Sequence, residues 1–345
     1  MPERIVVFRA LQLGDLLCAV PALRALRHHA PRARITLVGL PWARELARRL
    51  AACVDDFLEF PGVCGMPERT PDHSAFPRFI DTVRARRFDL AIQMHGDGTL
   101  TNLIVDDFGA PRVIGHHPHA QYARPGFRRW DTHAHEVLRW IDLLAATGVT
   151  PRGTALEFPL EAADHAALAL LLAARGIAGP IACVHPGSQL PSRRWSPASF
   201  AAVADALTAL DFTVVLTGTA GERTLTAAVR AAMRTPAHDL AGETSLGTLA
   251  ALIAKARLLV ANDTGVSHLA TAFGTPSVIV SSGGDARRWA PLARERHRVL
   301  YRDLPCRPCA HADCPLPGHP CAAGITSAMV MHALRPLVRD AVHVS

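Results

Sequence analysis

Polar turns that could bind phosphate follow several strand-like apolar runs in this sequence. In one of them, Asp263, Thr264 and Gly265 follow the apolar run 258–261 and open a helix that carries His268. Such a joint directs backbone N–H groups and the positive end of a helix dipole at one point, which suits a phosphate. We expect His268, one turn into the helix, to point back toward that end. Asp263 and Thr264 are also common N-cap residues, so a capped helix without a ligand is the alternative.

A second polar turn follows the apolar run 181–184 and contains Ser188, Arg193 and Arg194. Backbone amides, a hydroxyl and a guanidinium can converge there on a diphosphate. The alternative is a solvated loop with two surface arginines. The position of these side chains directly after a buried strand favours a binding site.

A third turn, after the run 212–216, contains Thr217, Gly218 and Glu222. A carboxylate at this place can hold a ribose diol, as acidic residues do in other nucleotide-binding folds. Glu222 would equally suit the first turn of the following helix, where a negative charge interacts favourably with the dipole.

The first half of the chain offers a candidate base. Asp15 follows Gly14 at the expected start of a helix. A helix N-terminus keeps a carboxylate ionised, and an ionised carboxylate can accept a proton from a sugar hydroxyl. An N-cap role is the structural alternative. Further along, the turn His95, Gly96 and Asp97 is the candidate acceptor-binding stretch.

Eight cysteines in a chain expected to be cytosolic should be mostly reduced. Four of them lie within sixteen residues and could ligate zinc or iron as thiolates, although the spacing before the last one differs from that of a zinc ribbon. Packed thiols or a redox-labile pair are the alternatives, and we expect no metal. The clustered cysteines are Cys306, Cys309, Cys314 and Cys321, and the scattered ones, expected to be small apolar residues, are Cys18, Cys53, Cys64 and Cys183.

Alternating strands and helices must position these turns. Such alternation predicts an α/β fold with parallel sheets and helices on both faces. We expect two Rossmann-like domains, residues 1–155 and 156–345, whose sheets face each other across a cleft, with the last helix a candidate to pack back on the first domain. Ligands then bind at the carboxyl ends of the strands. The segment 61–77 is expected to be a mobile loop. The expected strands are 4–8, 35–38, 54–60, 88–94, 112–115, 181–184, 212–216, 238–240, 257–261 and 277–280.

Composition bounds the class of protein. The chain has 345 residues, of which 49% are hydrophobic, and no apolar run approaches the length that crosses a bilayer. Charged residues near the N-terminus argue against a signal peptide, so we expect a cytoplasmic protein. The net charge of +7 comes almost entirely from arginine, which suits anionic ligands or a phosphate-bearing membrane face; compositional bias is the alternative. The sequence contains no nucleic-acid-binding motif.

Several motifs in chain order resemble glycosyltransferase family nine, the lipopolysaccharide heptosyltransferases. The resemblance covers nearly the whole chain. The motifs are Leu13-Gly14-Asp15 followed by Pro21-Ala22-Leu23-Arg24-Ala25-Leu26-Arg27, His185-Pro186-Gly187 with Arg194-Trp195, Leu240-Ala241-Gly242 with Thr244-Ser245-Leu246, Asn262-Asp263-Thr264-Gly265 through His268, and the Cys306–Cys321 pattern.

This resemblance implies a GT-B fold, with an N-terminal acceptor-binding domain and a C-terminal domain that binds a nucleotide sugar, usually ADP-heptose. It implies an inverting displacement that needs no metal or other cofactor. The family's catalytic base corresponds to Asp15 and its ribose contact to Glu222. Many members have lysine where this chain has Arg193, so the donor is held differently. The diphosphate contacts correspond to Ser188, Arg193, Asp263, Thr264, Gly265 and His268.

The function that follows is heptose transfer from ADP-heptose to the lipopolysaccharide core, with positive charge aiding contact with the inner membrane face. A protein or another glycan as acceptor, and a nucleotide-sugar-binding protein without activity, are the alternatives. An NAD-type epimerase is disfavoured, because the first strand is not followed by the glycine pattern that such enzymes use.

Overall fold

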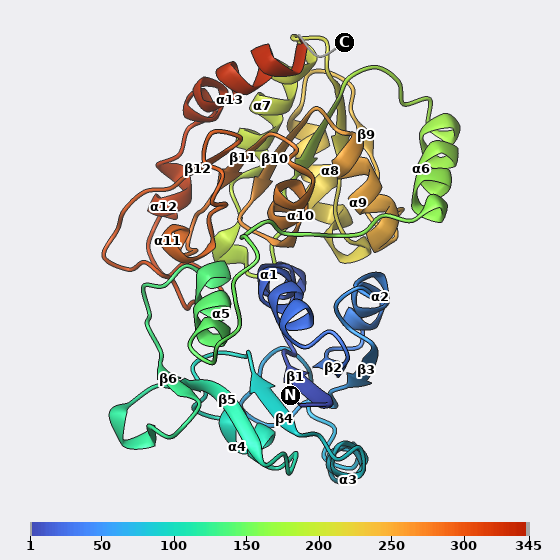
Figure 1. Ribbon diagram of the computed structural model, residues 1–345. Coiled ribbons are helices and arrows are strands. Elements are labelled where there is room, and N and C mark those ends of the chain that lie inside the picture. Colours follow the sequence, from blue (N-terminus) through green and yellow to red (C-terminus); the bar gives the residue numbers. More distant parts are fainter. Residues whose placement is uncertain (1, 343–345) are drawn as a thin grey trace. The chain divides into compact units, whose positions relative to one another are not determined.

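The computed structural model describes residues 2–342, with side chains through residue 338, and its contacts separate two compact units, Met1–Pro159 and Leu160–Ser345. The observed boundary lies four residues beyond the expected one. Each unit contains one six-stranded sheet whose strands are all parallel. The predicted α/β class with two Rossmann-like sheets is therefore confirmed (Figure 1).

The N-terminal sheet has the strand order β3-β2-β1-β4-β5-β6. Its inner strands are largely buried, because helices cover both faces of a parallel sheet; β1, for example, buries four of its five residues. The strands are β1 (Arg4–Phe8), β2 (Arg34–Gly39), β3 (Asp56–Glu59), β4 (Leu90–Gln93), β5 (Arg112–His117) and β6 (Phe127–Arg129). The helices are α1 (Leu13–His29), α2 (Ala43–Arg49), α3 (Ala75–Ala85), α4 (Thr101–Asp106), α5 (Glu136–Ala145) and the 3-10 turn η1 (Ala120–Tyr122).

The C-terminal sheet has the order β12-β11-β10-β7-β8-β9. The strands are β7 (Ile181–His185), β8 (Thr213–Leu216), β9 (His238–Asp239), β10 (Leu258–Asn262), β11 (Ser277–Val280) and β12 (His297–Leu300). The helices are α6 (Ala162–Ala174), α7 (Pro197–Thr208), α8 (Arg223–Ala232), α9 (Leu246–Lys255), α10 (Gly265–Phe273), α11 (Ala286–Trp289), α12 (Pro320–Ala323) and α13 (Ser327–Val342), with 3-10 turns η2 (Pro191–Arg193) and η3 (Ala220–Glu222).

Numbered from its own first strand, each sheet has the order 3-2-1-4-5-6, which is that of a dinucleotide-binding Rossmann fold. The strand order reverses between β1 and β4 in the first unit and between β7 and β10 in the second. In open parallel sheets, ligands bind outside the carboxyl ends of the two strands at such a switch point. The turns after these four strands are therefore where the fold itself places a binding site.

The last helix packs within its own unit. Val330, Leu334 and Leu337 of α13 are buried in the core that also contains Val278 and Val280 of β11. In Figure 1, α13 lies beside α7 on the C-terminal sheet, and the contacts of the two helices agree with that view.

Some elements were not expected from the sequence. Helix α3 begins inside the segment predicted to be a loop, with Pro77 as its third residue. Proline is tolerated in a first helical turn, because its missing N–H would have no intrahelical partner there. Strands β6 and β12 at the two sheet edges were also missed; β6 has only three residues, two of them arginine, and carries little apolar signal. Within the described residues, no helix has both the length and the apolar character needed to cross a membrane.

Candidate active site

Asp15 lies at the switch point of the N-terminal unit. It is the third residue of α1, which follows directly on the turn after β1, and its side chain is half-buried. The N-cap of α1 is Gln12, so the alternative role of Asp15 as the N-cap is wrong. Asp15 therefore lies in the first turn of α1, where a negative charge interacts favourably with the helix dipole.

A buried arginine holds the turn that leads to Asp15. Arg9 is completely buried directly after β1, and its Nε donates to the main-chain oxygen of Asp15 at 2.8 Å. Another N–H group of the same guanidinium donates to the carbonyl of Met94, at the end of β4. Arg9 therefore ties together the loops after the two strands that form the switch point.

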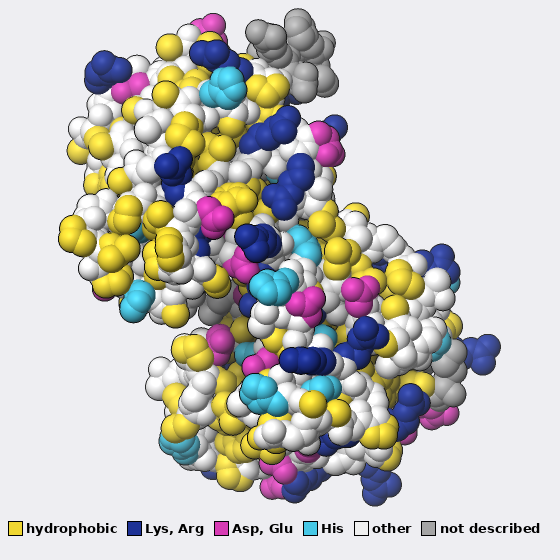
Figure 2. Space-filling model, turned by 90° about the vertical axis from the view of Figure 1, so that its left-hand side faces the viewer, with side chains coloured by type: hydrophobic (Ala, Val, Ile, Leu, Met, Phe, Trp, Pro, Cys, Tyr) yellow, Lys and Arg dark blue, Asp and Glu magenta, His cyan; other side chains and the backbone are white. Residues whose placement is uncertain are grey.

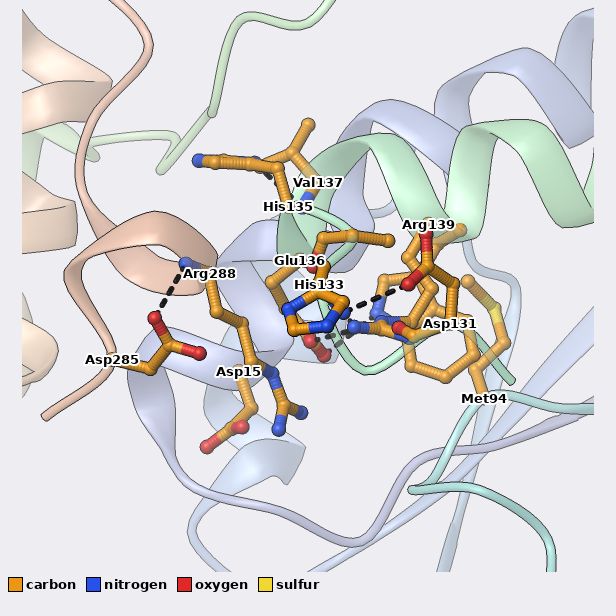
Figure 3. A network of polar contacts seen from close by, with 12 residues as sticks. Asp15, Met94, Asp131, His133, His135, Glu136, Val137, Arg139, Asp285 and Arg288 are labelled. Carbon is orange, nitrogen blue, oxygen red and sulfur yellow. Dashed lines mark hydrogen bonds and ion pairs between the residues drawn. The ribbon is translucent and has the colours of Figure 1, made fainter. Parts of the chain in front are cut away.

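The charge of Arg9 is balanced by Glu136, the first residue of α5. Their Nη2 and Oε1 atoms are 3.0 Å apart, and neither side chain is exposed. Trp140 donates its indole N–H to the same oxygen at 2.9 Å, and Arg139 lies 3.4 Å from the other one. Figure 3 shows Glu136 and Arg139 turned toward one another from α5, with Asp131 and Met94 close by. The sequence patterns pointed to neither Arg9 nor Glu136, because both look like ordinary surface charges until the fold buries them.

The candidate acceptor-binding stretch, His95 to Asp97, is only partly exposed to solvent. His95 is buried and stacks on Phe8 with 5.5 Å between ring centroids. Its Nε2 lies 3.7 Å from a carboxylate oxygen of Glu68, in the segment expected to be a loop. Although burial acts to raise it, hydrogen bonding to His95 holds the pKa of Glu68 below its usual value. Gly96 adopts a positive φ of 66°, and Asp97 accepts a hydrogen bond from the amide of Thr99 at 2.9 Å.

In the C-terminal unit, the side chain of Thr217 contacts His185, the last residue of β7. This residue follows β8 and is completely buried, and its Oγ1 lies 3.0 Å from Nδ1 of His185. Burial lowers the pKa of His185, against the opposing effect of the Glu222 carboxylate, so the ring is neutral. Thr217, predicted to contact the nucleotide, thus supports the loop through its side chain.

The turn after β7 keeps Ser188 and Arg194 together. Ser188 is buried, and its main-chain oxygen accepts a hydrogen bond from Nε of Arg194 at 2.9 Å. The neighbouring Arg193 donates through Nη2 to the carbonyl of Cys309 at 3.2 Å, while its buried Nε has no hydrogen-bond partner in the described structure. The two guanidinium groups thus flank one short turn.

Glu222 is the last residue of the 3-10 turn η3 and lies next to the turn after β7. Its Oε2 accepts hydrogen bonds from the amide and the hydroxyl of Thr219, at 2.8 and 3.0 Å, in a capping box. The same carboxylate lies over Gly187, where an added Cβ would overlap its oxygens, and against Gly218. The carboxylate thus caps η3 and also reaches the turn after β7.

Asn262, the last residue of β10, links the two strands of the switch point. Its completely buried side chain accepts from the amide of Trp195 at 3.0 Å and donates to the carbonyl of Pro186 at 2.7 Å. Both contacts join β10 to the segment after β7. The sequence motif contains Asn262, but its function as this link was not recognised.

Asp263 and Thr264 follow Asn262 and open α10. Thr264 is the N-cap residue but makes no capping hydrogen bond through its side chain in the described structure. Its extended backbone leads into Gly265, the first helical residue, and His268 is buried with its ring edge-on to Trp289. Burial raises the pKa of Asp263. The N-terminus of α10 thus faces the switch point, with its dipole directed at the place where an anion would bind.

The cysteine cluster is not arranged as a metal centre. Over the residues that the structure describes, no three histidine, cysteine, aspartate or glutamate side chains come together as ligands would. All the cysteines in that part of the chain are free thiols. Burial raises the pKa of Cys321, and the nearby Cys314 and Cys306 act in the same direction.

Comparisons with known proteins agree with this architecture. The family model described as glycosyltransferase family 9 (heptosyltransferase) matches residues 77–319. Lipopolysaccharide heptosyltransferase 3 of Escherichia coli is 24% identical over 322 residues, which cover 85% of this chain and 88% of that protein.

Solved structures show the same fold. The family 9 glycosyl transferase of Veillonella parvula matches with a TM-score of 0.82 at 22% identity, over 98% of both chains. The Escherichia coli ADP-heptose lps heptosyltransferase II matches with a TM-score of 0.76 at 21% identity, over 98% of this chain and 99% of that one. These likenesses confirm the predicted GT-B fold. Since the family match covers more than half of the sequence, the chain belongs to glycosyltransferase family 9, the heptosyltransferase family, and is a glycosyltransferase.

Proposed function

We propose that this enzyme transfers heptose from ADP-heptose to a hydroxyl of the lipopolysaccharide core. The C-terminal unit binds the donor and the N-terminal unit binds the acceptor. The observation that carries the proposal is that the predicted diphosphate-binding turns, after β7 and β10, are the two turns of one switch point. The named lipopolysaccharide relatives support the choice of sugar and acceptor.

The donor-binding surface combines three kinds of group. The first turn of α10 supplies backbone amides and a helix dipole, and Arg193 and Arg194 supply positive charge after β7. Glu222 supplies a carboxylate for the ribose. As the bond to the sugar breaks, negative charge grows on the departing ADP. Groups that interact with the ADP more strongly in the transition state than in the ground state accelerate the reaction.

Asp15 acts as the base in this proposal. The acceptor hydroxyl attacks the anomeric carbon, the bond to the ADP oxygen breaks, and the hydroxyl proton passes to the carboxylate. Arg9 fixes the turn from which Asp15 projects. The displacement needs the two substrates and no metal or other cofactor.

The enzyme would meet its lipid-linked acceptor at the inner membrane face from the cytoplasm. Its net charge of +7 favours an anionic surface. Figure 2 shows Lys and Arg side chains spread over the visible face among acidic and histidine side chains. Any attraction to the membrane would therefore come from diffuse charge on this face.

The test separates binding from transfer. Asp15→Ala should lower the turnover number at least about 100-fold, because general-base catalysis typically contributes that much, and should leave the dissociation constant for ADP unchanged. Asp81→Ala, which removes an exposed carboxylate from α3, is the matched control. Calorimetric titration gives the affinity for ADP, UDP and GDP, and transfer is followed to heptose-deficient lipopolysaccharide with and without a chelator.

Each outcome decides one part of the proposal. Unchanged turnover in Asp15→Ala would exclude Asp15 as the base. Tighter binding of UDP or GDP than of ADP would show that the donor is not an ADP-sugar. Donor binding without transfer to this acceptor would favour a protein or another glycan as acceptor, or a binding protein without activity.

A further inference from the structure

The cysteine-rich segment Cys306–His319 has no part in the proposed reaction, yet it contacts the turn after β7, which is proposed to bind the donor, and the turn after β11. It follows β12 and precedes α12, and it belongs to no helix or strand. Because an irregular segment must satisfy its backbone groups outside secondary structure, its hydrogen bonds show what it supports.

One set of contacts runs to the turn after β7. The amide of Ser192 donates to the carbonyl of Ala312 at 2.9 Å, and its hydroxyl donates to the carbonyl of His311 at 2.6 Å. The ring Nε2 of His319 lies 2.8 Å from the main-chain oxygen of Ser192. Ser192 is buried, and it is thus held by three residues of the segment.

Cys309 joins this turn to a second loop. Its carbonyl accepts from Arg193, and its amide donates to the carbonyl of Gly283 at 2.8 Å. An added Cβ at Gly283 would lie 3.0 Å from Cβ of Cys309, so glycine allows this close approach. The backbone of Cys309 makes the link, and its thiol makes no part of it.

Arg307 makes the densest set of contacts to the second loop, the turn Ser281–Gly284 that follows β11. Its Nη1 donates to the carbonyls of Ser281 and Ser282 at 2.6 and 3.0 Å, and its Nη2 donates to the carbonyl of Gly284 at 2.5 Å. Three main-chain oxygens of one tight turn thus converge on a single guanidinium, whose planar fork can reach all of them.

The same guanidinium reaches Asp263 through one hydroxyl. Nη2 of Arg307 lies 3.3 Å from Oγ of Ser281, and that hydroxyl donates to Oδ2 of Asp263 at 3.1 Å. A hydroxyl has one proton, so accepting from Arg307 directs that proton toward the carboxylate. Gly284 also approaches Asp263 closely, because a Cβ there would overlap Oδ2. The turn therefore fixes the position of the carboxylate.

We propose that Arg307 is a positioning residue for donor binding, which holds the Ser281–Gly284 turn and, through Ser281, orients the carboxylate of Asp263 at the N-terminus of α10. The inference rests on the proposed function, since it assumes that the donor binds at this switch point. It also assigns a role to the cysteine-rich segment: its backbone joins the turn after β7 to the turn after β11.

The charges around Asp263 supply an independent readout. Burial raises the pKa of this carboxyl; the hydroxyl of Ser281 and the guanidinium groups of Arg193 and Arg307 oppose that effect, and Asp285 acts with it. Loss of Arg307 therefore raises the pKa of Asp263 further. If the ionised carboxylate is the form that binds the donor, the acid limb of the binding profile moves to higher pH.

The experiment compares Arg307→Ala, Arg307→Lys and Ser281→Ala with the control Arg298→Ala, which removes the same charge from an exposed position on β12. Calorimetry measures the dissociation constant of ADP-heptose between pH 5 and 8, transfer assays give KM and kcat, and thermal unfolding checks that each variant folds. We expect the dissociation constant and KM to rise about tenfold or more in Arg307→Ala, with a smaller change in kcat and an acid limb at higher pH.

The other variants separate charge from geometry. Arg307→Lys keeps the charge but, with a single nitrogen, loses the planar fork that makes the four contacts with the Ser281–Gly284 turn, so it should restore the acid limb and only part of the affinity. Ser281→Ala should weaken binding with Arg307 in place. If Arg307→Ala fails to fold, Arg307→Lys and Ser281→Ala still test whether Arg307 positions the turn and the carboxylate of Asp263.

Two failures are distinguishable. If the unmodified enzyme does not bind ADP-heptose, the proposed function fails. If it does bind, and the Arg307 and Ser281 variants keep the affinity and pH profile of Arg298→Ala, the role of Arg307 is overturned and the proposed function stands.

Discussion

The two units have the same strand order, but they hold the loops at their switch points by different means. In the N-terminal unit a completely buried ion pair, Arg9 with Glu136, ties the turn of Asp15 to the end of β4. In the C-terminal unit Asn262 joins β10 to the turn after β7, and Arg307 holds the neighbouring turn after β11, mainly through neutral main-chain oxygens.

The difference matches what each switch point is proposed to do. A buried pair is costly to form and more costly to break, so it suits a loop that must present one carboxylate in one place. A loop that binds a diphosphate needs positive groups directed at the ligand. Bracing the C-terminal turns mainly through main-chain carbonyl groups does not require a direct ion pair with a carboxylate.

Breaking the N-terminal pair should give the largest effect. Glu136→Gln leaves the buried charge of Arg9 without its carboxylate, so we expect a loss of about 3–5 kcal/mol in the free energy of unfolding. Urea unfolding measures the loss, and hydrogen exchange should place it in β1, β4 and α5.

The matched control is Asp107→Asn, because Arg84 and Asp107 form a pair 3.4 Å apart with more than half of each side chain exposed. Exposed pairs contribute less than about 1 kcal/mol. Equal losses in Glu136→Gln and in this control would contradict the structural role of the buried pair.

Acid should weaken both units in the same way, because each has a buried histidine in its sheet whose pKa is lowered to about 4. Burial, assisted by Arg139, lowers the pKa of His116 to about 4, and burial, assisted by Arg296, does the same for His297. The unfolded chain takes up these protons first as the pH falls below 6.5, so stability is full above that pH and is lost between about 6.5 and 4. The slope is at most about 1.4 kcal/mol per pH unit for each histidine.

Single substitutions assign this slope to one unit at a time. His116→Gln should flatten it in the N-terminal unit and His297→Gln in the C-terminal unit, as followed by unfolding at a series of pH values. His133→Gln, at an exposed position, is the control. A slope that neither buried substitution changes would show that other groups govern the acid sensitivity.

The smallest expected effect tests close packing at the donor site. In Gly187→Ala the new methyl group displaces the Glu222 carboxylate. The end of a flexible side chain moves at little cost in stability, but we expect the dissociation constant for ADP to rise about tenfold, or ~1.4 kcal/mol. Calorimetric titration measures it.

Gly221→Ala lies in the same region, and its Cβ would come no closer than 3.9 Å to the nearest atom, Oγ1 of Thr219, so it should bind ADP normally. Glu222→Gln should reproduce the effect of Gly187→Ala. Normal binding in both of these variants would remove Glu222 from the donor site.

Much of the fold could be predicted from local signals. The apolar runs of β1, β7 and β10 are continuous because parallel strands are covered on both faces, and such runs are visible in any reading of the sequence. Edge strands such as β6 are short and charged, and α3 begins with a proline in its first turn, so neither gave a clear periodic signal.

The residues of the candidate site likewise fall into two groups, those that local sequence patterns predict and those that only the fold brings together. Asp15, Glu222 and the Asp263–Gly265 turn could be proposed from the sequence, because glycines, caps and acidic residues at strand ends form local patterns. Arg9, Glu136 and Arg307 could not, since a guanidinium near a carboxylate or a carbonyl is recognised only when residues far apart in the chain meet.

The sequence by itself thus determined the family, the alternation of strands and helices, and the turns that carry the proposed chemistry, all of which depend on residues close together in the chain. Only the tertiary structure decided which charges are buried and what neutralises them. Arg9 meets Glu136 across 127 positions and Arg307 meets the Ser281 turn from an irregular loop. Burial and charge pairing are properties of the packed chain, and no local pattern encodes them.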